Sequence, residues 1–123
     1  MHNICVVDDD ESVRTAMGRL VRSLGYHSLE FPSAEAFLAS SSLGETACLI
    51  ADVQMPGGMS GLDLQEALRA QGNLLPIILI TAFPDDAIRK RAQAAGASGF
   101  FGKPVDIQKL ILCVDAVLNE PRS

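Results

Sequence analysis

"ICVVDDDESVR", residues 4–14, places three aspartates directly after a short apolar run. Residues 4–7 predict a buried strand, and apolar residues at helical spacing follow from about residue 10 to residue 24. The three carboxylates repel one another, and carboxylates that leave water are destabilised unless a positive charge compensates them. This stretch therefore predicts either a solvated loop or a site for a cation at the end of a strand.

The alternation of an apolar strand and an amphipathic helix occurs five times along the chain. The predicted strands cover residues 4–7, 27–31, 47–52, 77–81 and a short run from 98, and the predicted helices cover about 10–24, 33–40, 61–72, 85–96 and 105–120. Continuous apolar strands indicate burial on both faces of a sheet, and strict alternation indicates parallel strands with right-handed crossovers. The predicted fold class is therefore α/β, a doubly wound five-stranded parallel sheet.

The length and composition favour one globular domain over residues 1–123, since hydrophobic residues make up 48% and charged residues 20% of the chain. A net charge of −5 argues against direct nucleic-acid binding, which needs a basic surface. No apolar run approaches the length of a membrane span, and no signal peptide begins the chain, so we expect a cytoplasmic protein without a membrane partner. The three cysteines are too scattered for a disulfide framework or a zinc site.

Chemically active residues follow several of the predicted strands. Asp8 and Asp9 follow the first strand, Asp52 ends the third, and Thr81 ends the fourth. Lys103 comes after the fifth strand. Because the carboxyl ends of parallel strands share one edge, we expect these side chains to meet there. The carboxylates would form a negative pocket suited to a hard cation such as Mg²⁺, with the lysine as a second positive charge.

Such a pocket suits phosphoryl chemistry. A carboxylate can act as a nucleophile and accept a phosphoryl group as an acyl phosphate. Asp52 is the predicted nucleophile because it stands alone at a strand end, whereas the adjacent Asp8 and Asp9 suit a shared metal. A metal and a lysine would neutralise charge on the transferring oxygens.

Five motifs carry a resemblance to a known family. They are "VVDDDESVR" (6–14), "LIADVQMP" (49–56), "GLDL" (61–64), "ILITA" (78–82) and "GFFGKP" (99–104), in this order and spacing. With them the chain resembles, over essentially its whole length, the receiver domain of two-component response regulators. The resemblance implies a flavodoxin-like (βα)5 fold like that of chemotaxis regulators, with strand order 2-1-3-4-5.

The resemblance also implies a set of metal and phosphoryl ligands. Asp52 would be the phosphoacceptor, phosphorylated by a sensor histidine kinase. Asp9 and Asp52 would bind Mg²⁺ directly, with Mn²⁺ as a substitute, and Asp8 would bind it mostly through water. The backbone carbonyl of Gln54 would complete the protein ligands. The domain would be a phosphoacceptor that assists its own phosphorylation and dephosphorylation, and not an enzyme in the ordinary sense.

A second set of residues would respond to the phosphoryl group. Thr81 would hydrogen-bond it, Lys103 would pair with it, and the small Ala82 would leave room for its oxygens. Phe100 matches the aromatic residue that turns inward when Thr81 moves, which would change the surface of the fourth helix and fifth strand. Since Phe100 and Phe101 alternate, we expect one in the core and the other at the surface or in the switch.

The chain departs from the family pattern near the site. "MPGGMSG" (55–61) is one residue longer than the usual loop after the phosphoacceptor, which leaves the shape of that loop open. Phe83 stands where many relatives have a polar residue, and a bulky apolar group there would screen the acyl phosphate from water. We therefore expect slow self-dephosphorylation, which Phe83→Glu should accelerate.

The resemblance extends to partners. Residues 1–123 contain no predicted output domain, so the chain is either a single-domain regulator or a segment of a longer protein. It looks like the receivers that precede a helix-turn-helix DNA-binding domain. Arg89, Lys90 and Arg91 are either a solvated helix face or, with Asp106, the source of reciprocal ion pairs in a phosphorylation-dependent homodimer.

Other classes of protein share parts of this pattern. A haloacid-dehalogenase-type phosphatase needs a second acid at the position of Gln54, and a flavodoxin-like electron carrier needs a phosphate loop where this chain has "DDDES". A nucleotide-binding Rossmann domain needs a glycine-rich motif after the first strand, where none is present. The remaining alternative is a receiver-like protein-binding module that is not phosphorylated.

Overall fold

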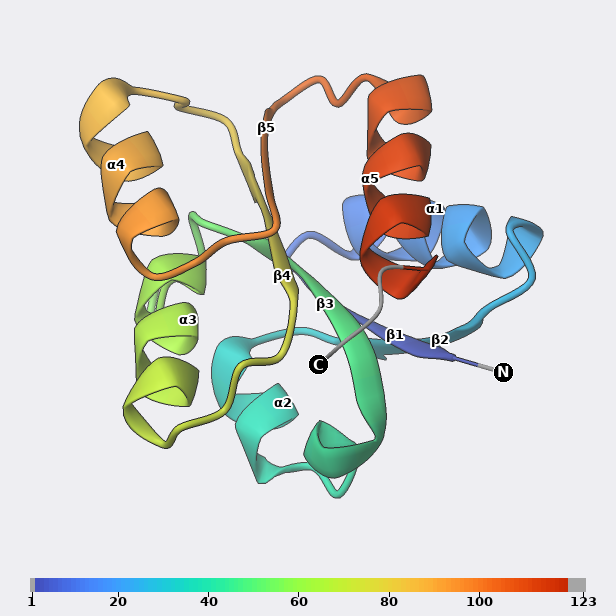
Figure 1. Ribbon diagram of the computed structural model, residues 1–123, viewed down its shortest axis with the longest axis horizontal. Helices are drawn as coiled ribbons and strands as arrows, with labels where there is room; N and C mark the ends of the chain where they lie inside the picture. The colour runs from blue at the N-terminus through green and yellow to red at the C-terminus, as the bar shows by residue number, and fades with distance from the viewer. Residues whose placement is uncertain (1, 120–123) are drawn as a thin grey trace.

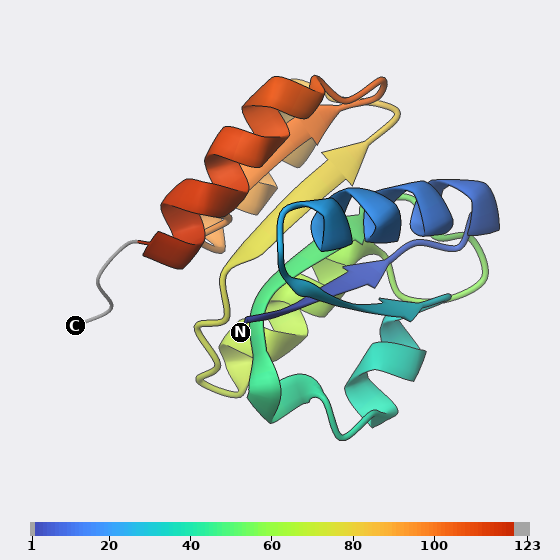
Figure 2. The same cartoon turned by 90° about the vertical axis from the view of Figure 1, so that its right-hand side faces the viewer.

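Five strands form a single sheet in the computed structural model, which describes residues 2–119. They are β1 (Asn3–Val7), β2 (His27–Phe31), β3 (Thr46–Asp52), β4 (Ile77–Thr81) and β5 (Gly99–Gly102). All neighbouring pairs are parallel, and the order is β2-β1-β3-β4-β5. Figure 2 shows the strands running in a common direction, so that their carboxyl ends lie along one edge. The predicted fold class and strand order are confirmed.

The helices follow the strands as the sequence predicts. They are α1 (Glu11–Ser23), α2 (Ala34–Ala39), α3 (Gly61–Ala70), α4 (Asp86–Ala94) and α5 (Ile107–Asn119). The predicted helices begin and end within a few residues of these bounds. A short 3₁₀ helix, Leu43–Glu45, has no counterpart among the sequence predictions.

Helices α1, α2 and α3 each follow a residue whose side chain accepts hydrogen bonds from free backbone N–H groups of the first turn. The Asp10 carboxylate accepts hydrogen bonds from the N–H groups of Ser12 and Val13, at 2.9 and 3.2 Å. Ser33 caps α2, and Ser60 caps α3 through a reciprocal pair of hydrogen bonds with Asp63. The third aspartate of the opening stretch is therefore accounted for by the helix that it starts, and Asp8 and Asp9 are left for the site.

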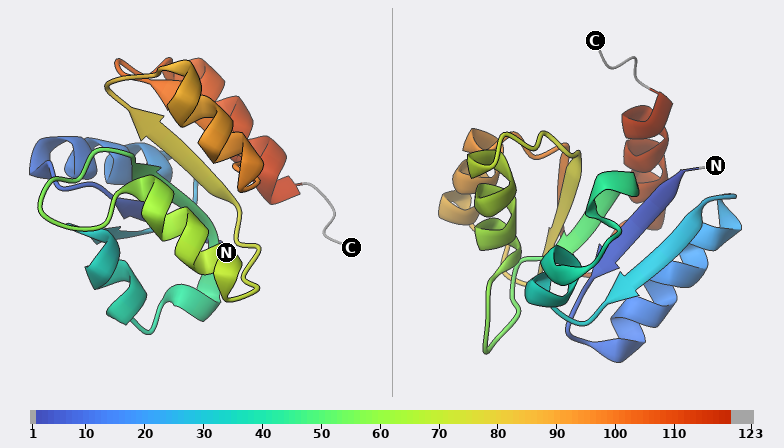
Figure 3. Two further views of the ribbon diagram at one scale, coloured as in Figure 1. Left: turned by 90° about the vertical axis from the view of Figure 1, so that its left-hand side faces the viewer. Right: turned by 90° about the horizontal axis from the view of Figure 1, so that it is seen from below.

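The helices cover both faces of the sheet. Helices α3 and α4 lie on one side, and α1 and α5 lie on the other (Figures 1 and 3). Alternate residues of each central strand accordingly enter different apolar clusters: Cys5, Leu49 and Leu79 face the first side, and Val6, Ile50 and Ile80 face the second. This arrangement explains why these strands are apolar at every position.

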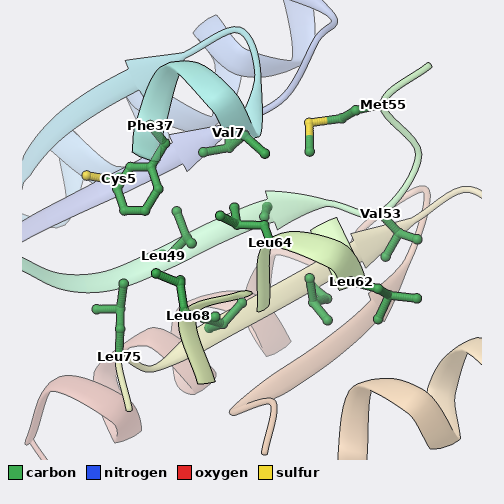
Figure 4. Close-up of a cluster of buried hydrophobic side chains, with 14 of the residues drawn as sticks. Cys5, Val7, Phe37, Leu49, Val53, Met55, Leu62, Leu64, Leu68 and Leu75 are labelled. Atoms are coloured by element: carbon green, nitrogen blue, oxygen red, sulfur yellow. The ribbon is translucent and has the colours of Figure 1, made fainter. Parts of the chain in front are cut away.

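The larger cluster joins α2 and α3 to the centre of the sheet. In Figure 4, Phe37 of α2 and Leu64 and Leu68 of α3 lie beside Leu49 of β3. All four side chains are fully buried. Each buried side chain of this size stabilises the fold by about 1.5–3 kcal/mol relative to an exposed one. The cluster therefore holds β3, and with it Asp52, in a fixed place.

The two aromatic residues of β5 differ from the sequence expectation. Phe100 packs against the cluster on the α3 side, and Phe101 packs against the cluster on the α1 side. Both are partly buried, so neither is a plain surface residue. The surface alternative is therefore wrong, because both faces of β5 are covered, whereas the role of Phe100 in the switch stays a prediction. Among the described residues, no helix has the length and apolar character needed to cross a membrane.

Candidate functional site

Three carboxylates meet at the carboxyl edge of the sheet. Oxygen atoms of Asp8, Asp9 and Asp52 all lie within 4.8 Å of one another. They meet because β1 and β3 are neighbours in register, with Val7 beside Ala51, so the residues that follow reach the same edge. Asp8 and Asp52 are each only 5% exposed, whereas Asp9 is exposed to solvent. The sequence predicted this meeting of the three acids.

Lys103 reaches the same cluster from the end of β5. Its Nζ lies 2.9 Å from Oδ2 of Asp52 and 3.8 Å from Oδ2 of Asp8. Burial by itself would lower the pKa of Lys103, but the hydrogen bond to Asp52 and the nearby carboxylates outweigh it and raise the pKa. Lys103 is therefore held in its charged form beside Asp52.

The ionised form of Asp8 is disfavoured in this cluster. Burial, and then the charges of Asp52 and Asp9, raise its pKa to about 6, although the backbone N–H of Asp10 and the charge of Lys103 act in the opposite direction. A hard divalent cation with oxygen ligands would relieve this repulsion. The donor set of closely spaced carboxylates, partly open to water through Asp9, fits Mg²⁺.

Arg14 is a neighbour of the site that the sequence did not indicate. Its Nη1 donates a hydrogen bond to the backbone carbonyl of Asp8, at 2.8 Å. It lies on α1, one turn after the cap, where the sequence gives only a helical pattern. The guanidinium fixes the chain segment that carries the first acid of the cluster.

Gln54 contacts both the acid cluster and Thr81. Its backbone N–H donates to Oδ1 of Asp52, at 3.1 Å. Its side-chain oxygen, Oε1, accepts hydrogen bonds from the hydroxyl of Thr81 at 2.9 Å and from the backbone N–H of Ala82 at 3.1 Å. The sequence pointed to the backbone carbonyl of this residue as a metal ligand, which stays a prediction, and it missed the side-chain contacts.

Thr81 and Phe83, at the end of β4 and just after it, lie in different environments. Thr81 is fully buried, and its hydroxyl oxygen accepts a hydrogen bond from the N–H of Phe83 at 3.0 Å. The Phe83 side chain is 67% exposed. Its ring therefore lies mostly in solvent in this arrangement, and slow self-dephosphorylation stays a prediction.

The segment between β3 and α3 is held by α2. The carboxylate of Glu35 accepts a hydrogen bond from the backbone N–H of Met59, at 2.8 Å. A Cβ atom on Gly58 would lie 2.8 Å from the same carboxylate, so a larger residue there would require the Glu35 side chain to shift. The longer loop thus follows the surface of α2, and Asp52 keeps its place at the end of β3.

The basic residues of α4 have partners within the chain. Arg91 forms ion pairs with Asp63 and Glu66 of α3, at 3.0 and 2.6 Å, and these hydrogen bonds raise its pKa. The guanidinium of Arg89 lies 5.3 Å from the centre of the Phe100 ring. All three basic residues are exposed, as expected for a solvated helix face, and two of them also contact α3 and β5. The ion pairs with Asp106 in a homodimer stay a prediction.

A family model and the sequences of known proteins agree on the family that this chain resembles. The family model described as the response regulator receiver domain matches residues 4–115. Over 116 residues the chain is 41% identical to the response regulator protein TodT of Pseudomonas putida, covering 94% of this chain and 51% of that protein. It is 36% identical over 114 residues to the transcriptional regulatory protein FixJ of Azorhizobium caulinodans, covering 93% and 54%.

A solved structure agrees with the sequence comparisons. The structure of the response regulator StyR superposes with a TM-score of 0.86 at 40% sequence identity, covering 94% of this chain and 58% of that one. The chain therefore spans about half the length of the curated relatives it matches.

Proposed function

The chain belongs to the response regulator receiver domain family, and on that premise we propose that Asp52 accepts a phosphoryl group from a histidine kinase. The observation that carries the proposal is the contact of Lys103 Nζ with Asp52 at 2.9 Å, inside a cluster that also contains Asp8 and Asp9. The charged lysine beside this buried carboxylate can stabilise the negative charge that a phosphoryl group adds.

The transfer is a displacement at phosphorus. One carboxylate oxygen of Asp52 forms a bond to the phosphorus of a phosphohistidine. The nitrogen–phosphorus bond breaks, and the imidazole leaves with the electron pair. Lys103 lies where it can bind an oxygen of the transferred group, and the hydroxyl of Thr81 can donate to another.

Asp8, Asp9 and Asp52, with the backbone carbonyl of Gln54, would hold a Mg²⁺ or Mn²⁺ ion, which would supply positive charge to the transferring oxygens. The pKa of Asp8, raised by burial and then by the charges of Asp52 and Asp9, supports this assignment, because a cation would stabilise the ionised carboxylate. The domain acts as a phosphoacceptor and not as an enzyme with a separate substrate.

Phosphorylation would be transmitted through Thr81 and Phe100 to the surface of α4 and β5. Thr81 ends β4 beside β5, and Arg89 of α4 lies over Phe100, so a change at Thr81 has a short path to both elements. Occupancy of the site shifts the population between two packings of this face. FixJ is a transcriptional regulatory protein of about twice the matched length, which supports an output domain that acts in transcription as the target of the signal. A phosphorylation-dependent homodimer is the second possible target.

The test is direct. The protein is incubated with a histidine kinase, or with acetyl phosphate as a small donor, with and without Mg²⁺, and is weighed intact. We expect a gain of one phosphoryl group that requires Mg²⁺ and disappears in Asp52→Asn. The control is Asp86→Asn, which changes an exposed acid of α4 and should leave the gain intact. Absence of a gain in the unaltered protein would favour a binding module that is not phosphorylated.

A further inference from the structure

We propose that the side chain of Gln54 occupies the phosphoryl position of the unphosphorylated protein and has to leave when Asp52 is modified. The inference rests on the proposed function, because it concerns the pocket in which the phosphoryl group would lie. It assigns to Gln54 a role as an internal competitor, separate from the metal-ligand role of its backbone carbonyl.

Two donors of the pocket already have an acceptor. The hydroxyl of Thr81 and the N–H of Ala82 both point to Oε1 of Gln54, at 2.9 and 3.1 Å. The backbone N–H of the same Gln54 donates to Asp52 at 3.1 Å, so the amide side chain starts from beside the acceptor carboxylate. One neutral oxygen thus stands where two donors converge near Asp52.

The competition follows from the number of hydrogens. A threonine hydroxyl has one hydrogen and a backbone amide has one, so each makes one strong donated hydrogen bond at a time. The hydroxyl oxygen of Thr81 also accepts from the N–H of Phe83 at 3.0 Å, which fixes its orientation toward Gln54. Thr81 therefore cannot donate to a phosphoryl oxygen while it donates to Gln54.

The displaced side chain has a place to go. Gln54 also lines an open groove of about 400 Å³ between the segment after β3 and α4, which Pro56, Leu62 and Ile88 line as well. Rotation into this groove needs no movement of the backbone N–H that binds Asp52. Because hydrogen bonds to a charged phosphoryl oxygen are stronger than those to an amide oxygen, the exchange is favourable once the group is attached.

The effect on affinity is measurable with beryllofluoride, a non-covalent analogue of the phosphoryl group, in the presence of Mg²⁺. Removing the competing acceptor in Gln54→Ala should tighten beryllofluoride binding about three- to tenfold, because the Thr81 hydroxyl and the Ala82 N–H then exchange only water for the ligand. Gln93→Ala removes an exposed glutamine from α4 and should leave the affinity unchanged. Equal or weaker binding by Gln54→Ala would overturn the inference.

A second measurement follows the side chain itself. The side-chain amide signals of Gln54 are assigned in an NMR spectrum by their loss in Gln54→Ala. They should shift toward the positions of solvated glutamines when beryllofluoride is added, and the amide proton of Ala82 should respond at the same ligand concentration. Bound beryllofluoride with unmoved Gln54 signals would show that the amide stays in place, and the inference would be wrong.

The two proposals fail in different ways. If Asp52 accepts no phosphoryl group in any variant, the proposed function fails. The Ala82 amide signal then still tests the contact, because Gln54→Ala should move it and accelerate its hydrogen exchange even without any ligand. If Asp52 is phosphorylated normally but Gln54→Ala changes neither affinity nor the Ala82 signal, only the present inference fails.

Discussion

Leu49 and Asp52 lie three residues apart on β3, and both are almost completely buried, at 0% and 5% exposure. Leu49 is surrounded by the apolar side chains that pack α2 and α3 on the sheet (Figure 4). Asp52 has two other carboxylates and one lysine as neighbours. Burial stabilises the first residue and opposes the charge of the second. The apolar interior of the sheet therefore stabilises the fold and offsets the cost of burying carboxylates at its charged edge.

The largest effect should come from breaking the interior. Leu68→Ala removes a fully buried side chain between α3 and the sheet, and we expect the free energy of unfolding to fall by about 2–5 kcal/mol. Leu74→Ala is the matched control, because Leu74 is 79% exposed, and it should change stability little. Urea denaturation followed by circular dichroism measures both. Similar losses in the two variants would contradict the packing described for α3.

The next largest loss of stability is expected where the apolar interior meets the acid cluster, at the start of α3. Gly61 begins α3, and a Cβ atom there would collide with the backbone carbonyl oxygen of Asp52 and come within 3.2 Å of Leu79. We expect Gly61→Ala to lower the free energy of unfolding by about 2–3 kcal/mol and to reduce Asp52 phosphorylation. Gly44→Ala meets no atom within 4 Å and should be close to neutral. Normal stability and phosphorylation of Gly61→Ala would show that α3 can move away from Asp52 freely.

At the charged edge, in contrast, removal of a carboxylate should increase the free energy of unfolding. Since the pKa of Asp8 is raised from 3.8 to about 6, the folded protein binds the proton more tightly than the unfolded chain. The stability that protonated Asp8 contributes is therefore present below pH 4 and lost as the pH rises through 6. Asp8→Asn should be more stable than the unaltered protein by about 2–3 kcal/mol above pH 7 without a divalent cation, and the difference should vanish near pH 4.

Thermal unfolding over a series of pH values, with and without Mg²⁺, measures this difference. Mg²⁺ should stabilise the unaltered protein more than Asp8→Asn, because it binds the folded state through the carboxylate that the variant lacks. Asp86→Asn, at an exposed position outside the acid cluster, should not reproduce the stabilisation of Asp8→Asn above pH 7. A pH-independent difference between Asp8→Asn and the unaltered protein would mean that the charge of Asp8 is not what destabilises the edge.

The sequence predicted the parts of the site that lie at strand ends. Asp52 and Thr81 end β3 and β4, and Asp8 follows β1, so parallel strands in register bring them to one edge. Their position depends on where the apolar run of each strand ends, and this can be recognised from a few neighbouring residues of the sequence. The strand order itself was predicted from the family resemblance, since periodicity alone does not rank the neighbours of a strand.

Other contacts were decided by the tertiary structure. Gln54 and Thr81 are 27 residues apart, and Glu35 and Met59 are 24 apart. Arg91 meets Glu66 across 25 residues. A polar side chain in a loop or on a helix surface has many partners within reach, and the choice depends on where the packed core places the backbone.

By itself, the sequence determined the α/β fold class, the five strand–helix units and the acids that end the strands, because burial on both sheet faces leaves a continuous apolar pattern. Only the tertiary structure decided that Gln54 receives the hydrogen bonds of Thr81 and Ala82, and that Arg89 and Arg91 bind α4 to its neighbours. The physical reason is that burial of apolar residues follows a short repeat along the chain, whereas a hydrogen bond needs donor and acceptor within about 3 Å, a distance set by the whole fold.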